Sequence, residues 1–132
     1  MKTQVTFRST QFPPYDGEQE QINPGLWGKR LAEYLAGKLK TEGIPAGKPV
    51  AEDWGWLVPI PGGPVPMALC CGHQDGDDDE FLVFTEPSAP VIRKLFRKID
   101  VSEPLGRLVA ALEKVLAADP AIRDVSWSDH GT

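Results

Sequence analysis

The sequence predicts one α+β domain, residues 1–132, in which helices cover a mainly antiparallel sheet to form a two-layer sandwich. First, a chain of 132 residues suits a single hydrophobic core of ordinary size. Second, strand-like patterns gather in the middle of the chain, between stretches whose apolar residues recur with helical spacing. Third, the 13 glycines and 13 prolines mostly stand where one pattern changes to the next. The predicted order is β-α-β-β-β-α-α-β.

The N-terminal third predicts a strand and then a helix. Residues 4–12 alternate between apolar side chains such as Val5 and Phe7 and polar ones, which is typical of a half-buried strand, and a loop follows to about residue 22. Asn23 then offers an N-cap side chain, and the proline after it suits a first helical turn. We therefore expect a helix over 24–42. Its apolar residues recur every three or four positions: Trp27, Leu31, Leu35 and Leu39.

The middle of the chain predicts a three-stranded antiparallel meander over 50–86. Residues 50–60 are rich in aromatic and β-branched side chains and indicate one bent strand. A Pro-Gly-Gly-Pro turn follows, and residues 65–73 are typical of the returning strand. After a polar, acidic turn over 74–79, the run beginning at Phe81 predicts a buried third strand. Strands this apolar need to be covered on at least one face.

The last third predicts two helices and a final strand. Helical spacing of apolar residues recurs over 92–99 and again over 105–116, and Pro104 marks the break between the two. An Asp-Pro pair at Asp119 ends the second helix. Residues 122–127 then fit a short strand.

Composition and charge disfavour several classes of partner and place the chain in a soluble, cytoplasmic setting. Nineteen acidic residues against 14 basic ones leave a formal charge of −5, the wrong sign for general binding to nucleic acid or to an anionic membrane. No stretch has the length of a membrane span, and the N-terminus lacks an apolar signal core. The two cysteines are neighbours and cannot staple distant segments, which agrees with a reducing compartment.

The first candidate site is the Glu52-Asp53-Trp54-Gly55-Trp56 sequence. On a regular strand Glu52, Trp54 and Trp56 share one face, and Asp53 takes the other. A carboxylate buried beside two indoles acquires a raised pKa, which suits general acid or base catalysis near neutral pH. The alternative, which we favour, is that the indoles pack in a core or groove and the carboxylates accept hydrogen bonds from a loop.

The second candidate site is the Cys70-Cys71-Gly72-His73 sequence. Cys71 and His73 project to one face of a strand and Cys70 to the other, so the sulfurs do not chelate one metal, and no Cys-x2-Cys spacing exists. We expect no metal and no cofactor. A Cys71 thiolate activated by His73 is one hypothesis, and the favoured alternative is that both cysteines are small core residues.

The acidic run Asp75-Gly76-Asp77-Asp78-Asp79-Glu80 invites comparison with a calcium loop. Asp75, Asp77, Asp79 and Glu86 occupy positions 1, 3, 5 and 12 of such a loop, but position 6 holds Glu80 in place of glycine, and a strand pattern follows. A solvated hairpin tip is favoured, and it is also an electrostatic handle for a basic partner. The basic side chains over 93–98 indicate an ordinary solvated helix face.

Two motifs carry a resemblance to a known family. With Asn23-Pro24-Gly25-Leu26-Trp27-Gly28 before the first helix and Glu52-Asp53-Trp54-Gly55-Trp56 after it, the chain resembles a family of small bacterial proteins of unknown function. The resemblance extends over most of the chain, to about Trp127. It implies a bacterial, cytoplasmic, single-domain protein, and it supplies no activity, cofactor or catalytic residue.

Two hypotheses for function follow. The favoured one is a non-enzymatic protein-interaction module, in which Trp27, Trp54 and Trp56 line a groove and the acidic loop beside it attracts a basic partner; a toxin-neutralising immunity protein is one version. The alternative is a small hydrolase-like or ligand-binding enzyme that uses Glu52 or Asp53 with His73 across the hairpin. The sequence indicates no oligomeric state.

Overall fold

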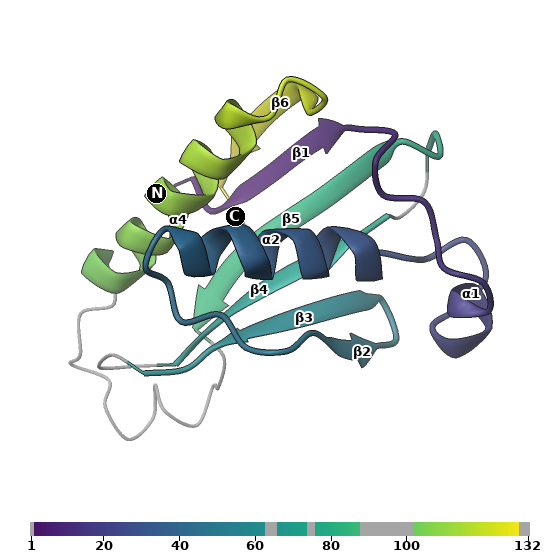
Figure 1. Cartoon of the computed structure of the whole chain (residues 1–132), viewed down its shortest axis with the longest axis horizontal. Helices are drawn as coiled ribbons and strands as arrows, with labels where there is room; N and C mark the ends of the chain where they lie inside the picture. Colours follow the sequence, from purple (N-terminus) through teal and green to yellow (C-terminus); the bar gives the residue numbers. More distant parts are fainter. Residues whose placement is uncertain (1, 63–65, 74–75, 88–101, 130–132) are drawn as a thin grey trace.

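The computed structural model describes residues 2–62, 66–73, 76–87 and 102–129, and these form an antiparallel six-stranded sheet with helices (Figure 1). The sheet has the order β2-β3-β4-β5-β1-β6. The strands are β1 (Gln4–Arg8), β2 (Val50–Glu52), β3 (Gly55–Ile60), β4 (Met67–Gly72), β5 (Glu80–Pro87) and β6 (Arg123–Ser128). The helices are α1 (Glu18–Gln21), α2 (Lys29–Thr41) and α4 (Ser102–Ala118). The predicted α+β class, with its antiparallel sheet, is confirmed.

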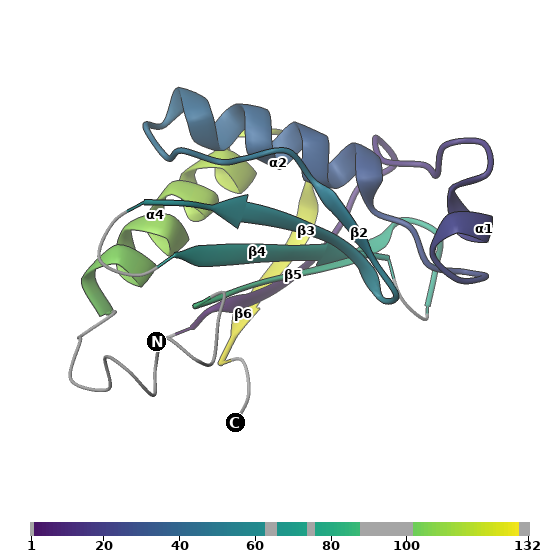
Figure 2. The ribbon, with the colours of Figure 1, turned by 90° about the horizontal axis from the view of Figure 1, so that it is seen from below.

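Both long helices pack on the same side of the sheet (Figure 2). α2 contacts β3 and β4, and α4 contacts β5 and α2. Because strand side chains alternate in direction, every second residue of the inner strands points at the helices, as Phe7, Val58 and Val83 do. The centre of this core is closed by fully buried leucines from both helices: Leu31, Leu35, Leu39, Leu108, Leu112 and Leu116. No helix of the described residues is long and apolar enough to cross a membrane.

The predicted bent strand over 50–60 is wrong, because the chain reverses direction inside it. β2 and β3 are two antiparallel strands in which Glu52 pairs with Gly55 across a tight turn. The turn requires glycine at position 55, where φ is +149° and a Cβ atom would lie 2.6 Å from the carbonyl oxygen of Cys71. Glu52, Trp54 and Trp56 therefore do not lie on one face of one strand.

The other predicted elements differ from the structure mainly at their ends. The first strand stops at Arg8, and the first long helix begins at Lys29, after an additional short helix, α1. The predicted order β-α-β-β-β-α-α-β therefore does not match the observed sequence of elements. The helix predicted over 105–116 lies within α4, and the last predicted strand coincides closely with β6. The helix predicted over 92–99 lies outside the described residues.

Candidate functional site

The structure separates the three tryptophans that were expected to line one groove. Trp27 and Trp56 are buried on the helix side of the sheet, with 6% and 4% of their surface exposed. Trp54 is half-buried, and its ring centroid lies 6.3 Å from that of Phe84. Phe84 pairs in register with Cys70, on the face of the sheet opposite α2 and α4. The expectation of a groove formed by all three rings is wrong.

Glu52 and Asp53 are not brought together with His73. Both acidic residues are exposed at the turn between β2 and β3, and the carbonyl oxygen of Asp53 accepts a hydrogen bond of 2.8 Å from the Asn23 side chain. Glu52 pairs in register with Gly55, whose neighbour Trp56 faces the helices, so the Glu52 side chain lies toward the opposite face of the sheet. Among the described residues, neither carboxylate forms a hydrogen bond or an ion pair with His73, whose ring nitrogens lie at backbone carbonyl oxygens, so the geometry gives no basis for an acid-base pair.

His73 is buried and links the end of β4 to the loop that precedes α2. Its ring stacks on Trp27 with the centroids 3.7 Å apart and the planes within 4° of parallel. Nδ1 lies 2.8 Å from the carbonyl oxygen of Gly25, and Nε2 lies 3.0 Å from that of Asp77. The backbone N–H of His73 also donates to the carbonyl oxygen of Trp27. Two of the predicted site residues, Trp27 and His73, therefore form one unit.

A pocket of about 600 Å³ lies beside the stacked rings of Trp27 and His73. Its buried wall includes Phe12, Trp27 and His73, and its outer wall includes Asp78 and Asp79 of the loop between β4 and β5. The indole N–H of Trp27 donates to the carbonyl oxygen of Phe12, which holds these two sides of the wall together. The result is an aromatic pocket with carboxylates at its mouth, an arrangement suited to a ligand with an apolar stem and a positive end.

The buried carboxylate of Glu18 positions the loop that carries Trp27. Its Oε2 accepts hydrogen bonds from the backbone N–H groups of Gly28 and Lys29 and from the indole N–H of Trp56, at 2.8, 2.9 and 2.9 Å. Its Oε1 accepts from the N–H of Tyr15 at 2.9 Å. These donors occupy both oxygens, so Glu18 caps the start of α2 from a position outside the helix.

The acidic loop between β4 and β5 is organised by two arginines. The Arg8 guanidinium pairs with Asp77, Asp79 and Glu80, and Arg123 pairs with Asp79. The tip at Asp77 is exposed, as expected for a solvated hairpin tip, and the arginine pairs in addition tie the loop to the sheet. Asp78 is exposed and forms no ion pair with the other described residues, so its charge faces outward at the mouth of the pocket.

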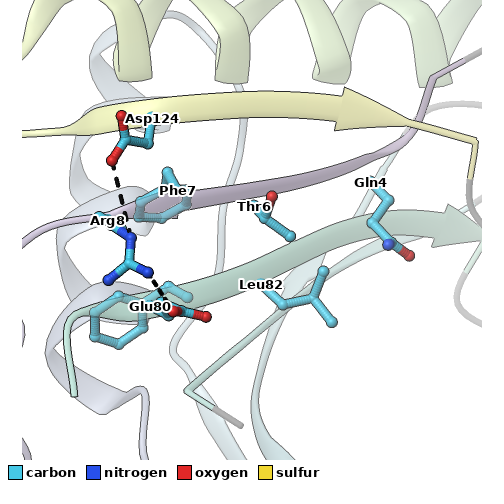
Figure 3. A pocket seen from close by; sticks show the side chains of 8 residues that line it. Gln4, Thr6, Phe7, Arg8, Glu80, Leu82 and Asp124 are labelled. Atoms are coloured by element: carbon cyan, nitrogen blue, oxygen red, sulfur yellow. Dashed lines mark hydrogen bonds and ion pairs between the residues drawn. The ribbon is translucent and has the colours of Figure 1, made fainter. Parts of the chain in front are cut away.

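Arg8 also lines a pocket of about 360 Å³ between the strands, on the face of the sheet opposite the helices (Figure 3). Figure 3 shows its guanidinium between Asp124 of β6 and Glu80 of β5, with Thr6, Gln4 and Leu82 further along the strands. The positive charge here is already compensated by carboxylates. We assign this cluster a structural role, since it ties three strands and a loop together.

The two cysteines are core residues and not nucleophiles. Cys70 and Cys71 are 2% and 1% exposed. Burial, with the nearby Glu86 and Glu52, raises the pKa of Cys70 to about 12, and burial raises the pKa of Cys71 well above its ordinary value. Thiols with such values are protonated at neutral pH and poorly reactive. This agrees with the favoured interpretation of the cysteines.

The calcium-loop hypothesis also fails on geometry. Asp79 is paired with Arg8 and Arg123, and Glu86 lies in the extended strand β5 where an EF-hand has a helix. In the part of the chain that the structure describes, no group of His, Cys, Asp and Glu side chains is arranged to hold a metal ion.

Comparison with known proteins gives no family: no family model, curated protein or solved structure matches the chain. The resemblance to a bacterial family therefore stays a prediction, and function has to be argued from the site.

Three residues important to the site were not identified from the sequence: Phe12, Glu18 and Arg8. Phe12 closes the predicted first strand and so carried a signal of burial, but nothing local indicates that it faces Trp27. The bond between Glu18 and Gly28 spans 10 positions of the chain and the pair between Arg8 and Glu80 spans 72, and no local pattern reveals such contacts.

Proposed function

We propose that this protein is a non-enzymatic interaction module that binds a basic protein partner, and that the pocket beside the Trp27–His73 stack receives a lysine or arginine side chain of that partner. The observation that carries the proposal is the juxtaposition of an aromatic pocket wall with the outward-facing carboxylate of Asp78. A version in which the partner is a toxic effector, neutralised as by an immunity protein, is one form of it.

Charge and shape both support a cationic ligand. The chain has a formal charge of −5, and its acidic loop flanks the pocket, so long-range attraction would steer a basic protein toward this end of the molecule. Inside the pocket, the methylene stem of lysine or arginine would contact Phe12 and the Trp27–His73 stack. Its charged end would reach the carboxylate of Asp78 at the mouth, where exposure to water limits the strength of the pair.

The enzyme hypothesis has less support from the described residues. The cysteines are buried and protonated, and Glu18 is occupied by four donors. Both ring nitrogens of His73 already face backbone carbonyl oxygens. Glu52 and Asp53 are exposed at the β2–β3 turn. No specific observation favours a catalytic role over a binding role.

The proposal is tested by NMR titration with the peptide acetyl-Gly-Arg-Gly-amide and with its neutral counterpart acetyl-Gly-Gln-Gly-amide. We expect only the arginine peptide to shift the indole N–H signal of Trp27 and the ring signals of His73, and the shifts to weaken as sodium chloride is added.

Asp78→Asn should lower the affinity for the arginine peptide by up to about fivefold, since one exposed charge pair is worth up to about 1 kcal/mol. Glu113→Gln is the matched control, because it removes the same charge from an exposed position on α4. Equal shifts with both peptides, or equal losses in both variants, would contradict the proposed pocket.

A further inference from the structure

We propose that a second pocket, at the opposite end of α2, binds a small apolar carboxylate such as a medium-chain fatty acid. The pocket has a volume of about 250 Å³. It lies between the loop that follows α2, the end of β3, the start of β4 and the first turns of α4. The proposed protein-binding pocket is lined by residues that precede α2, and this one by the loop that follows it. The segments before and after α2 lie at opposite ends of the helix (Figure 1), so the two sites are separate and this inference does not rest on the first.

The floor of this second pocket is apolar and already shielded from water. Ile60, Met67 and Leu108 line it and are 7%, 3% and 1% exposed. Ile44 forms a side wall and packs against the same core. A flexible alkyl or aryl group entering here would exchange contact with water for contact with these side chains, which favours binding in proportion to the apolar area covered.

The rim restricts what polar group a ligand can carry. Pro45, Pro61 and Pro104 stand around the opening, and none of them has a backbone N–H to donate. Arg107, one turn beyond Pro104 on α4, is exposed and is the single ionisable residue among the described residues that line the pocket. A ligand with an apolar body therefore meets one strong donor at the mouth, a planar guanidinium suited to a carboxylate.

The carbonyl oxygens at the C-terminal end of α2 are not free to repel an anion bound at Arg107. The carbonyl oxygens at the end of the helix accept internal hydrogen bonds, that of Leu39 from the N–H of Ile44 at 2.9 Å and that of Lys40 from the N–H of Gly43 at 3.0 Å. Among the described residues, Arg107 forms no ion pair. Its charge is thus available to an anion at the pocket mouth.

The volume sets the size of the ligand. Pockets for drug-sized molecules measure roughly 300–1,000 Å³, so this one suits a ligand of about ten non-hydrogen atoms. Octanoate has this size and the required chemistry, and we use it as the probe together with octanamide and octylammonium, which keep the chain and change the charge.

The test is a methyl NMR titration of the full chain with each probe below its micelle concentration. We expect octanoate to shift the methyl signals of Ile60, Met67 and Leu108, octanamide to bind more weakly, and octylammonium to bind most weakly. Equal affinity for all the probes, or no octanoate shift at these methyl groups, would overturn the proposal.

Substitutions test the contribution of the Arg107 charge and that of the apolar cavity one at a time. Arg107→Gln should weaken octanoate by up to about fivefold, to the level of octanamide, because the charge pair with an exposed guanidinium is lost. Lys114→Gln, further along α4 with a side chain 71% exposed, is the matched control and should leave octanoate binding unchanged. Ile44→Trp should fill the pocket and weaken all three probes, with folding checked by circular dichroism. Unaltered octanoate binding in Arg107→Gln would overturn the role assigned to the guanidinium.

Discussion

At the scale of single residues, the environment of a side chain decides its chemistry here. Cys70 and Cys71 lie close to His73 in the sequence, yet both cysteines are buried. His73 itself is buried against Trp27, with both ring nitrogens at carbonyl oxygens. Residue types that suggest a nucleophile and its base are thus used for packing and for joining two loops.

The cysteines provide a prediction about reactivity. At pH 8 we expect Ellman's reagent to modify the folded protein far more slowly than the unfolded chain. Raising the pKa of Cys70 from its ordinary 9.0 to about 12 lowers its thiolate fraction by about a thousandfold. The variants Cys70→Ala and Cys71→Ala assign any reaction to one sulfur. Rapid modification of either thiol in the native protein would contradict the assignment to the core.

The same shift has a consequence for stability against pH. Because the pKa of Cys70 is raised on folding, the thiol contributes stability that is fully present below its unfolded pKa of 9.0. That contribution is lost progressively as the pH rises toward about 12. The loss of stability between these values should be smaller in Cys70→Ala than in the parent protein, as measured by urea unfolding.

At the scale of elements, the start of α2 depends on a residue outside the helix. Gly28 occupies the N-cap position and offers no side chain, so the first N–H groups of the helix would be left without acceptors. Glu18, ten positions earlier, supplies the missing carboxylate oxygen and also binds the indole of Trp56. A single buried side chain therefore fixes the helix start, the loop before it and the adjacent strand β3.

Glu18→Gln is predicted to lower the free energy of unfolding by about 2 kcal/mol, because an amide cannot present two acceptor oxygens and a buried N–H group is left unsatisfied. Urea denaturation followed by tryptophan fluorescence measures this. Glu20→Gln, at an exposed position on α1, is the control and should be close to neutral. A similarly small effect in both variants would show that the bonds of Glu18 do not stabilise the fold.

At the scale of the whole molecule, Arg8 links parts that are distant in the sequence. It lies on β1 and pairs with Asp77 and Asp79 of the β4–β5 loop, with Glu80 at the start of β5, and with Asp124 of β6. The central position of β1 between β5 and β6 makes this possible. The cluster holds the acidic loop against the sheet and so shapes the wall of the proposed protein-binding pocket.

Arg8→Gln should lower the melting temperature by a few degrees at low salt, because the carboxylates around it would repel one another without the guanidinium. The deficit should shrink in 1 M sodium chloride, where the screening length falls to about 3 Å. Lys114→Gln breaks one isolated, exposed pair with Glu42 and should cause little change at either salt concentration. A deficit independent of salt would indicate lost packing instead of lost charge pairing.

Much of the fold could be predicted from local patterns, and much of the site could not. The alternation of Val5 and Phe7 and the helical spacing that begins at Leu31 identify β1 and α2, because burial on one face leaves a period in the sequence. The turn at Asp53 and Trp54 was missed, since one glycine in an apolar run is compatible with both a bulge and a reversal.

The sequence by itself determined the α+β class, the acidic charge and the apolar surfaces that have to be buried, because each of these depends on composition or on spacing between near neighbours. Tertiary structure alone decided that Trp27 meets His73, that Trp54 and Trp56 lie apart, and that Glu18 and Arg8 organise the loops. Those contacts join residues from different strands and loops, and their partners are selected by the register of the sheet and the close packing of the core, neither of which is written in any single stretch of the chain.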